Sequence, residues 1–252
     1  MVLAGIVIFI ARRQRALSPS GAAAALVVGT ICSAAGWGWA ILLVTFFVSA
    51  SGLSLNGRAL KAERTGAMAE KGSERDAVQV VANGGVFAAL AIVSLVYPSP
   101  VWLAAAAGAI AAATADTWAT EVGTLARHEP MLITTRERVP AGTSGAVTWR
   151  GTLAGFAGAA LTAVVALLTG WGTRAALASL AGGVAGSLID SILGATIQRR
   201  QWCERCDKPT ERLVHSCGTM TQPRGGIGWV GNDMINALGS LTGAVVGFLL
   251  PF

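Results

Sequence analysis

Four carboxylates lie in stretches that are otherwise apolar enough to be buried in a membrane. Asp116 and Glu121 close the segment "VWLAAAAGAIAAATADTWATEVG", Asp190 lies in "GSLIDSILGATIQ", and Asp233 lies in "GNDMIN". An acid at the centre of a membrane helix costs roughly 2.5–3.5 kcal/mol on insertion scales, so such residues are functional candidates by default. Hard oxygen ligands with open positions suit Mg²⁺ together with a substrate phosphate. We therefore predict that these four acids bind Mg²⁺ and orient a nucleotide.

The four acids do not all have the same expected role. Asp116 and Glu121 are separated by about 140° around a helix, so they cannot both point at one ion from the same face. We expect Asp116 to be the direct ligand and Glu121 to orient a metal-bound water or a neighbouring phosphate-binding arginine. Simpler roles remain open for the other acids: Asp233, or Asn232 beside it, as an N-terminal helix cap, and Asp190 as a packing partner of a neighbouring helix.

The composition is that of an integral membrane protein. Of the 252 residues, 53% are hydrophobic and 13% are charged, whereas soluble domains carry about 25% charged residues. With roughly 20 apolar residues needed for each span, the sequence predicts an all-α polytopic bundle of seven or eight transmembrane helices that uses residues 1–252 as one domain. The expected helices cover 1–11, 21–36, 38–55, 77–97, 101–123, 147–169, 176–198 and 232–251.

Basic residues are concentrated in four segments between these helices. The segments hold 18 of the 19 Lys and Arg residues, and Arg174 is the exception. Because the helix count puts all four segments on one face, the positive-inside rule predicts that they are cytoplasmic, that both termini lie outside, and that the protein is a multi-pass protein of the cell membrane. The net charge of +6 could indicate binding to nucleic acid, but this placement of the basic residues argues against it. The 18 residues are Arg12, Arg13 and Arg15; Arg58, Lys61, Arg64, Lys71 and Arg75; Arg127, Arg136, Arg138 and Arg150; and Arg199, Arg200, Arg205, Lys208, Arg212 and Arg224.

This topology brings the acids to one depth, near the cytoplasmic ends of their helices. Amide side chains begin two of the helices at the same depth, Asn83 in one and Asn232 and Asn236 in the other. No basic residue is expected within the helices to neutralise the acids, so a divalent cation is the expected partner.

Two basic, glycine-rich turns open onto this depth. Residues 133–152 hold Arg136 and Arg138 before a glycine-flanked Thr143–Ser144, and residues 222–233 hold Arg224 and four glycines before the last helix. Backbone N–H groups at such turns and at helix N-termini favour anions, although neither turn is a Walker motif. We predict that phosphate groups are bound by Asn83, Arg136, Arg138, Thr143, Ser144, Arg224, Asn232 and Asn236.

Three of the four cysteines lie in the predicted cytoplasmic loop 199–231, in "CERCDKPTERLVHSC". Disulfides are rare in the cytoplasm, and three thiolates with one imidazole match a structural Zn²⁺ site. Cys203, Cys206, His215 and Cys217 are therefore either the ligands of one Zn²⁺ that braces the loop before Asp233, or free thiols beside a solvated histidine.

The segments "ADTWATEVG", "VPAGTSGAVTWRGTLAG", "GSLIDSILGATIQ", C-x₂-C…H-x-C and "GND-x₂-N" together resemble the integral-membrane family once catalogued as domain of unknown function ninety-two. The resemblance covers nearly the whole chain, and plant members of the family act as phytyl-phosphate kinases. It implies Mg²⁺-dependent phosphoryl transfer from a nucleoside triphosphate, CTP or ATP, to an isoprenyl monophosphate of the phytyl or geranylgeranyl type. The alternatives are a membrane nucleotidyltransferase acting on a lipid phosphate and a cation-coupled transporter.

Overall fold

The computed structural model describes residues 2–66, 68 and 74–251, and Lys71 of the basic segments lies outside them. All eight expected helices are present, with ends that differ from the expected ones by up to four residues. A further short helix, Arg58–Thr65, occupies a segment that the sequence analysis treats as loop. The helices are α1 (Val2–Arg13), α2 (Pro19–Ala35), α3 (Trp37–Leu55), α4 (Arg58–Thr65), α5 (Ala77–Val96), α6 (Pro100–Gly123), α7 (Trp149–Leu168), α8 (Gly172–Thr196) and α9 (Asn232–Leu249).

Local capping explains where several helices begin. The Ser18 hydroxyl accepts a hydrogen bond from the Gly21 N–H at the start of α2, and Thr148 caps α7 in the same way. At α5, Asp76 and Gln79 form a reciprocal capping box. The N-cap of α9 is Gly231, without a side-chain hydrogen bond, so the interpretation of Asp233 or Asn232 as its cap is wrong.

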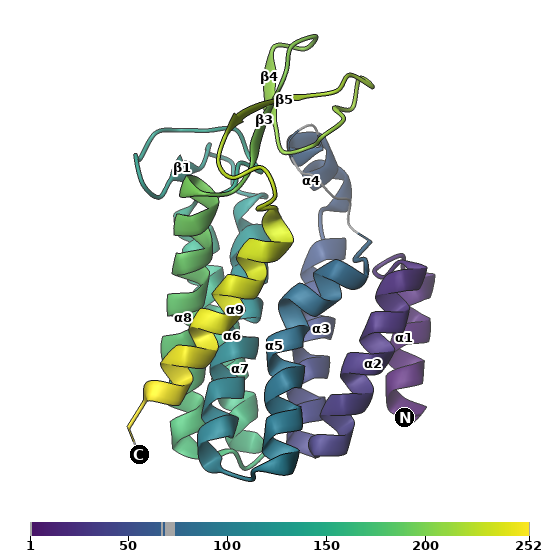
Figure 1. The fold of residues 1–252 in the computed structure, drawn as a ribbon, viewed down its shortest axis with the longest axis vertical. Helices are drawn as coiled ribbons and strands as arrows, with labels where there is room; N and C mark the ends of the chain where they lie inside the picture. The colour runs from purple at the N-terminus through teal and green to yellow at the C-terminus, as the bar shows by residue number, and fades with distance from the viewer. Residues whose placement is uncertain (1, 67, 69–73, 252) are drawn as a thin grey trace.

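The helices form one bundle, with the long connections at one end and both termini at the other (Figure 1). We call these the loop end and the opposite end. Five helices, α3, α5, α6, α7 and α8, are long and apolar enough to cross a membrane, and α2 is a shorter apolar helix. The chain is therefore a multi-pass membrane protein, as the sequence predicts.

The connections at the loop end contain short strands that the sequence analysis did not predict. β1 (Met131–Leu132) pairs with β2 (Ala146–Val147), and β3 (Arg200–Cys203) lies between β4 (Lys208–Thr210) and β5 (Gln222–Gly225) in an antiparallel sheet. These strands shape the loops that carry the predicted phosphate-binding and cysteine residues.

Exposed aromatic side chains mark both ends of the bundle. Trp149 and Trp229 are 67% and 72% exposed at the loop end, and Trp37 and Tyr97 are 78% and 70% exposed at the opposite end. Aromatic side chains with a polar atom are enriched where a membrane meets water. Their positions indicate that the membrane spans the bundle between these two levels.

Small residues let α6, α8 and α9 approach one another closely. In one layer Gly108, Gly182 and Gly243 meet, and a Cβ atom on Gly182 would lie 2.7 Å from the Gly243 carbonyl oxygen. One turn nearer the loop end, Gly186 contacts Ala112 and Gly239 in a second layer. Close backbone approach through small residues is the usual way in which membrane helices gain van der Waals contact. These two layers fix the relative height and rotation of the three helices.

We predict that Gly243→Val destabilises the bundle. Its Cβ would overlap the Gly108 carbonyl oxygen and lie 2.8 Å from the Ala112 Cβ, and overpacking of this kind costs about 1–3 kcal/mol. Gly52→Val on α3 is the matched control, because a Cβ there has nothing within 4 Å. Thermal unfolding in detergent should show a lower midpoint for Gly243→Val than for Gly52→Val, and equal midpoints would contradict the packing argument.

The orientation of the loop end is a second prediction. Cysteines introduced at Glu63, Glu129 and Ile227 should be protected from a membrane-impermeant thiol reagent in intact cells, because the basic loop end is expected to be cytoplasmic. A cysteine at Thr173, on the opposite end, should be labelled. Labelling is measured as the increase over the parent protein, and labelling of the loop-end positions from outside would reverse the topology.

Candidate functional site

Asp116 and Asp190 lie together where the tight contact between α6 and α8 ends. Each follows a member of the second small-residue layer by one turn, Asp116 after Ala112 and Asp190 after Gly186. The two carboxyl groups lie close enough to interact directly with each other. We call them the acid pair. The sequence predicts these two acids at one depth, and the structure brings their side chains together.

The acid pair has one oxygen without a partner. Asp190 Oδ2 is buried and receives no hydrogen bond from the described residues, and it faces the backbone of Gly239 on α9. Two carboxylates in contact repel each other unless a proton or a cation lies between them. Mg²⁺ is commonly held by one or two carboxylates together with substrate phosphates. The donor set and the unsatisfied oxygen therefore fit this ion.

α9 places further polar side chains toward the same level. Gly239 contacts Asp190, and Asn236 lies one turn nearer the loop end of α9, with Asp233 one turn beyond it. Asn236 and Asp233 are partly buried. Ser240, which follows Gly239, is buried and its hydroxyl has no hydrogen-bond partner among the described residues. The half of α9 that packs against Asp190 through Gly239 therefore also carries a carboxylate, an amide and a hydroxyl.

Glu121 belongs to a different environment. Its Oε2 lies 2.6 Å from Lys61 Nζ on α4, and Lys61 also donates a hydrogen bond to the Leu53 carbonyl oxygen at 2.5 Å. The Glu121 side chain is 18% exposed and that of Lys61 is 11% exposed. The expectation that no basic side chain would neutralise these acids is therefore wrong for Glu121. Lys61 was missed because a short polar helix gives no apolar period in the sequence.

The predicted phosphate-binding residues lie in several different surroundings. Arg136 and Arg138 are exposed, and Arg136 has a left-handed backbone with φ of 60°. Thr143 donates a hydrogen bond to the Pro140 carbonyl oxygen. Arg224 stacks over the Trp202 ring at 5.0 Å.

The remaining predicted residues include one that is already engaged with a carboxylate. The Ser144 hydroxyl donates to Glu211 Oε1 at 2.5 Å, and its N–H donates to the same oxygen at 3.1 Å. Asn232 is exposed at the start of α9, and Asn83 lines an apolar cavity beside α2 and α3. Ser144 therefore faces a negative group in this structure, which disfavours a phosphate at the same position.

Glu211 is the residue that sequence reasoning missed most completely. Besides Ser144 it accepts a hydrogen bond from Gln198 Nε2 at 3.1 Å, and its N–H donates to the Met68 carbonyl oxygen at 3.0 Å. It is 7% exposed. Because Met68, Ser144 and Gln198 belong to three different connections, Glu211 joins these connections at the loop end. No local motif in the sequence signals this role.

The four predicted zinc ligands converge. The ligand atoms of Cys203, Cys206, His215 and Cys217 all lie within 4.8 Å of one another. Cys203 Sγ lies 3.6 Å from Cys217 Sγ, and His215 Nδ1 lies 3.3 Å from Cys217 Sγ. A tetrahedral ion with zinc–sulfur bonds of about 2.3 Å separates its sulfur ligands by roughly 3.8 Å. The geometry and the donor set fit a closed, structural Zn²⁺ site.

Two of these thiols differ in how readily they ionise. Hydrogen bonds with the Thr219 hydroxyl and with His215 lower the pKa of Cys217 to about 5. The hydrogen bond with Cys217 raises the pKa of Cys206 to about 11. Since the thiolate is the form that binds a metal, Cys217 is the thiol already prepared for binding near neutral pH.

We predict that protein purified without added zinc contains about one equivalent of the metal, as a closed Cys₃His site requires. Cys206→Ser should reduce the bound zinc, whereas Cys32→Ser should not, because Cys32 is buried in α2 away from the cluster. Elemental analysis and thermal stability check this. A metal-free protein that is as heat-stable as after zinc addition would show that these residues are plain thiols.

Comparison with known proteins shows which family this chain is similar to. The family described as "Integral membrane protein DUF92" matches residues 2–244. Protein PGR of Arabidopsis thaliana is 30% identical over 262 residues, covering 94% of this chain and 89% of the relative. An uncharacterised membrane protein of Methanocaldococcus jannaschii is 31% identical, covering 95% and 87%.

A more distant relative is the chloroplastic protein VTE6 of Arabidopsis thaliana, which is 25% identical and covers 93% of this chain and 65% of the relative. No solved structure matches the chain significantly. The family match and the two relatives at about 30% identity each extend over nearly the whole chain. The chain therefore belongs to the DUF92 family of integral membrane proteins.

Proposed function

We propose that this protein is a membrane kinase that transfers the γ-phosphoryl group of a nucleoside triphosphate to an isoprenyl monophosphate and makes the diphosphate. The observation that carries the proposal is the acid pair, two contacting carboxylates at the loop end of a membrane bundle, one of them with an unsatisfied oxygen. The sequence resemblance to the phytyl-phosphate kinase family supports the choice of substrate. An acceptor with a lipid tail and an anionic head would react near a membrane surface, and the acid pair lies in the halves of α6 and α8 next to the loop end.

Asp116 and Asp190 would hold Mg²⁺, and Asp233 and Asn236 would complete the ligands or orient the bound phosphates. When bound, Mg²⁺ neutralises charge on the β- and γ-phosphates. An oxygen of the lipid phosphate attacks the γ-phosphorus, the bond to the bridging β,γ-oxygen breaks, and the nucleoside diphosphate leaves. The chain needs no general base, because a phosphate monoester is already anionic at neutral pH. Its role is to position the reactants and balance their charge.

A transporter is the main alternative from another class. A cation path should place polar groups in both halves of the membrane. In the described helices every Asp and Glu lies in the half next to the loop end. The buried hydroxyls of Thr162 and Ser179, in the other half, donate to carbonyl oxygens of their own helices. This one-sided distribution favours a surface site over a path.

A membrane nucleotidyltransferase acting on a lipid phosphate would use the same acids and would release diphosphate. Product analysis separates the two reactions. Purified protein in detergent is incubated with ATP or CTP and with several prenyl monophosphates, and the products are identified by mass. A kinase gives a prenyl diphosphate and a nucleoside diphosphate, whereas a nucleotidyltransferase gives a nucleotidyl lipid.

We predict that Asp116→Asn and Asp190→Asn each lower kcat by about two orders of magnitude or more, because each removes a charge from the acid pair with little change in volume. The double variant should lose little more than either single variant, since both act on one ion. Glu121→Gln should lose less, because Lys61 already neutralises Glu121. Near-normal turnover by Asp116→Asn in well-folded protein would remove the centre of the proposed site.

A further inference from the structure

An apolar cavity lies between α1, α2, α3 and α5. The acid pair, where α6 meets α8, lies on the other side of the bundle. The cavity is a groove that is partly open to the surface of the bundle. Leu17, Val28, Leu43, Phe47 and Val80 are among its lining residues. Its lining is almost entirely apolar, as a lipid chain requires.

The polar residues of this cavity come from one short stretch of chain. Arg75, Gln79 and Asn83 line it, at and just before the start of α5 near the loop end. Gln79 accepts a hydrogen bond from the Asp76 N–H, and Asn83 donates to the Gln79 carbonyl oxygen at 3.0 Å. The cavity is therefore amphipathic, with its polar groups at the level of the membrane surface.

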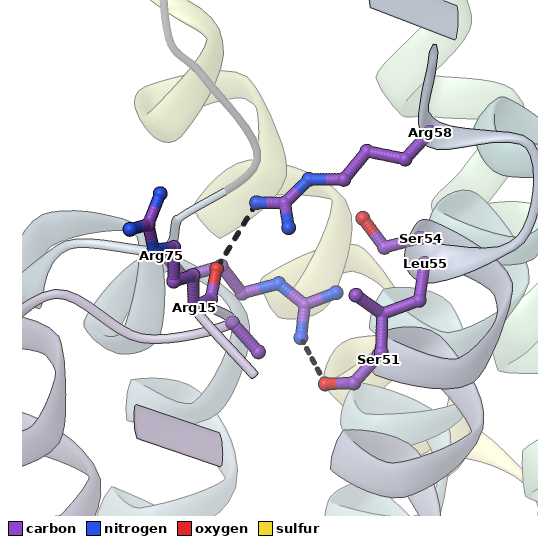
Figure 2. Close-up of a pocket in the computed structure, with 7 residues that line it drawn as sticks. Arg15, Ser51, Ser54, Leu55, Arg58 and Arg75 are labelled. Atoms are coloured by element: carbon purple, nitrogen blue, oxygen red, sulfur yellow. Dashed lines mark hydrogen bonds between the residues drawn. The ribbon is translucent and has the colours of Figure 1, made fainter. Parts of the chain in front are cut away.

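A second, basic pocket has Arg75 in common with this cavity. It is lined by Arg15, Arg58 and Arg75 with Ser51, Ser54, Ala16 and Leu55 (Figure 2), and we call it the arginine pocket. Among the described residues that line it, three are arginines and none is a carboxylate. Arg75 lines both cavities, and the adjacent residues Ala16 and Leu17 line one each. The basic and apolar spaces therefore share the Arg75 side chain as part of their lining.

Contacts within the arginine pocket hold its arginines in place. Arg58 Nη2 donates to the Arg15 carbonyl oxygen at 3.2 Å, and Arg75 Nη1 donates to Ser51 Oγ at 3.4 Å. The Arg75 backbone also bonds to Ala16 and Ser18, so its position does not depend on its side chain. Arg15 ends the α1 turn with φ of 53°, a left-handed conformation in which glycine is usual at this position. An arginine there, at a conformational cost, is consistent with a use for its charge.

The surroundings of Arg75 also indicate a use for its positive charge. Burial lowers its pKa below the ordinary value for arginine, and the charge of Glu121 opposes this effect. Glu121 Oε2 lies 2.6 Å from Lys61 Nζ. The negative charge of Glu121 is therefore shared between Lys61 and Arg75. Glu121 lies five residues after Asp116 on α6, about 7.5 Å along the helix axis. The arginine pocket thus lies at a level close to that of the acid pair.

We propose that the two cavities form one binding site for a single-chain lipid phosphate, with the chain in the apolar cavity and the phosphate monoester in the arginine pocket. Three arginines match the two negative charges of a monoester better than the single charge of a bilayer phosphodiester. The inference rests on the proposed function for the identity of the lipid, an isoprenyl monophosphate. It assigns Arg75, Arg58 and Arg15 to a holding site for the lipid phosphate. Because the acid pair lies on another side of α6, the phosphate has to leave this holding site to reach the nucleotide.

A binding experiment tests the site without requiring turnover. Full-length protein in phosphatidylcholine nanodiscs is irradiated with a geranylgeranyl phosphate analogue that carries a diazirine in its chain, and the labelled peptides are mapped. The expected labels lie on α2, α3 and α5, and geranylgeranyl phosphate should compete for them. Equal competition by geranylgeraniol would overturn the phosphate part of the proposal. Equal competition by phosphatidic acid would contradict the claim that the site prefers a single-chain lipid. Competition by inorganic phosphate alone would contradict the claim that the site binds the lipid chain.

Matched variants locate the two halves of the site. Arg75→Gln and Arg58→Gln should each weaken labelling about tenfold or more, because each removes a charge-assisted contact, whereas the exposed Arg150→Gln should not. Ala25→Phe, which fills the apolar cavity, should weaken competition by geranylgeranyl phosphate more than competition by geranyl phosphate. Leu26→Phe, 44% exposed on the outer face of α2, should not. Unchanged labelling in Arg75→Gln, Arg58→Gln and Ala25→Phe would overturn the site.

Kinetics separate this inference from the proposed function. If the protein is a kinase, Arg75→Gln should raise the KM for the lipid phosphate about tenfold and leave the KM for the nucleotide unchanged. An unchanged lipid KM would show that the cavity is not the holding site for the acceptor. If the wild-type protein transfers no phosphoryl group to any prenyl phosphate, the proposed function fails, and the labelling experiment still decides whether the lipid-phosphate site exists.

Discussion

The close approach of α6, α8 and α9 is the constraint on which the candidate site depends. Membrane helices gain little from hydrophobic burial against one another, so their association relies on dense van der Waals contact. Gly108, Gly182 and Gly243 form one contact layer, and Ala112, Gly186 and Gly239 form the next. One turn further, the small residues are replaced by Asp116 and Asp190. The spacing that brings backbones together in the first two layers therefore forces two carboxylates together in the third.

The polar residues around α6 lie on two different sides of this helix. On one side the acid pair faces α8 and the polar start of α9. On the other, Glu121 meets Lys61 and acts on Arg75, beside a space bordered by three arginines. A negative centre suits a cation with a nucleotide, and a positive one suits an anionic lipid head. One helix, α6, is common to both, which gives a structural reason for two acids of opposite orientation within a single turn and a half.

The sequence predicts the parts of this arrangement that depend on local pattern. Long apolar runs predict the eight membrane-associated helices, and the C-x₂-C…H-x-C spacing predicts the convergence of Cys203, Cys206, His215 and Cys217, because ligands so close in sequence need little tertiary help. The common depth of Asp116 and Asp190 follows from counting helices. Family membership follows from motifs spread over the whole chain, and the comparisons confirm it.

What escapes prediction depends on partners that are distant in the chain. Helix α4 is short and polar, so its Lys61 gives no signal that it reaches Glu121 sixty residues later. Ser144 fits a phosphate-binding turn until the fold brings Glu211 to it, 67 residues away. The arginine pocket combines Arg15, which follows α1, with Arg58 and Arg75 from the segment between α3 and α5, and the three residues share no motif. Such contacts arise from the packing of the whole bundle, which one sequence does not reveal.

Glu211 also determines where the chain can change in length. It bonds to Ser144, Gln198 and the backbone of Met68, so residues inserted beside any of these would pull one connection away from the other two. The turns at the opposite end, between α5 and α6 and between α7 and α8, have no bond to this carboxylate. Both chain termini lie at that end as well. Purification tags and fluorescent fusions therefore belong at the termini, where an added segment leaves the loop-end assembly undisturbed.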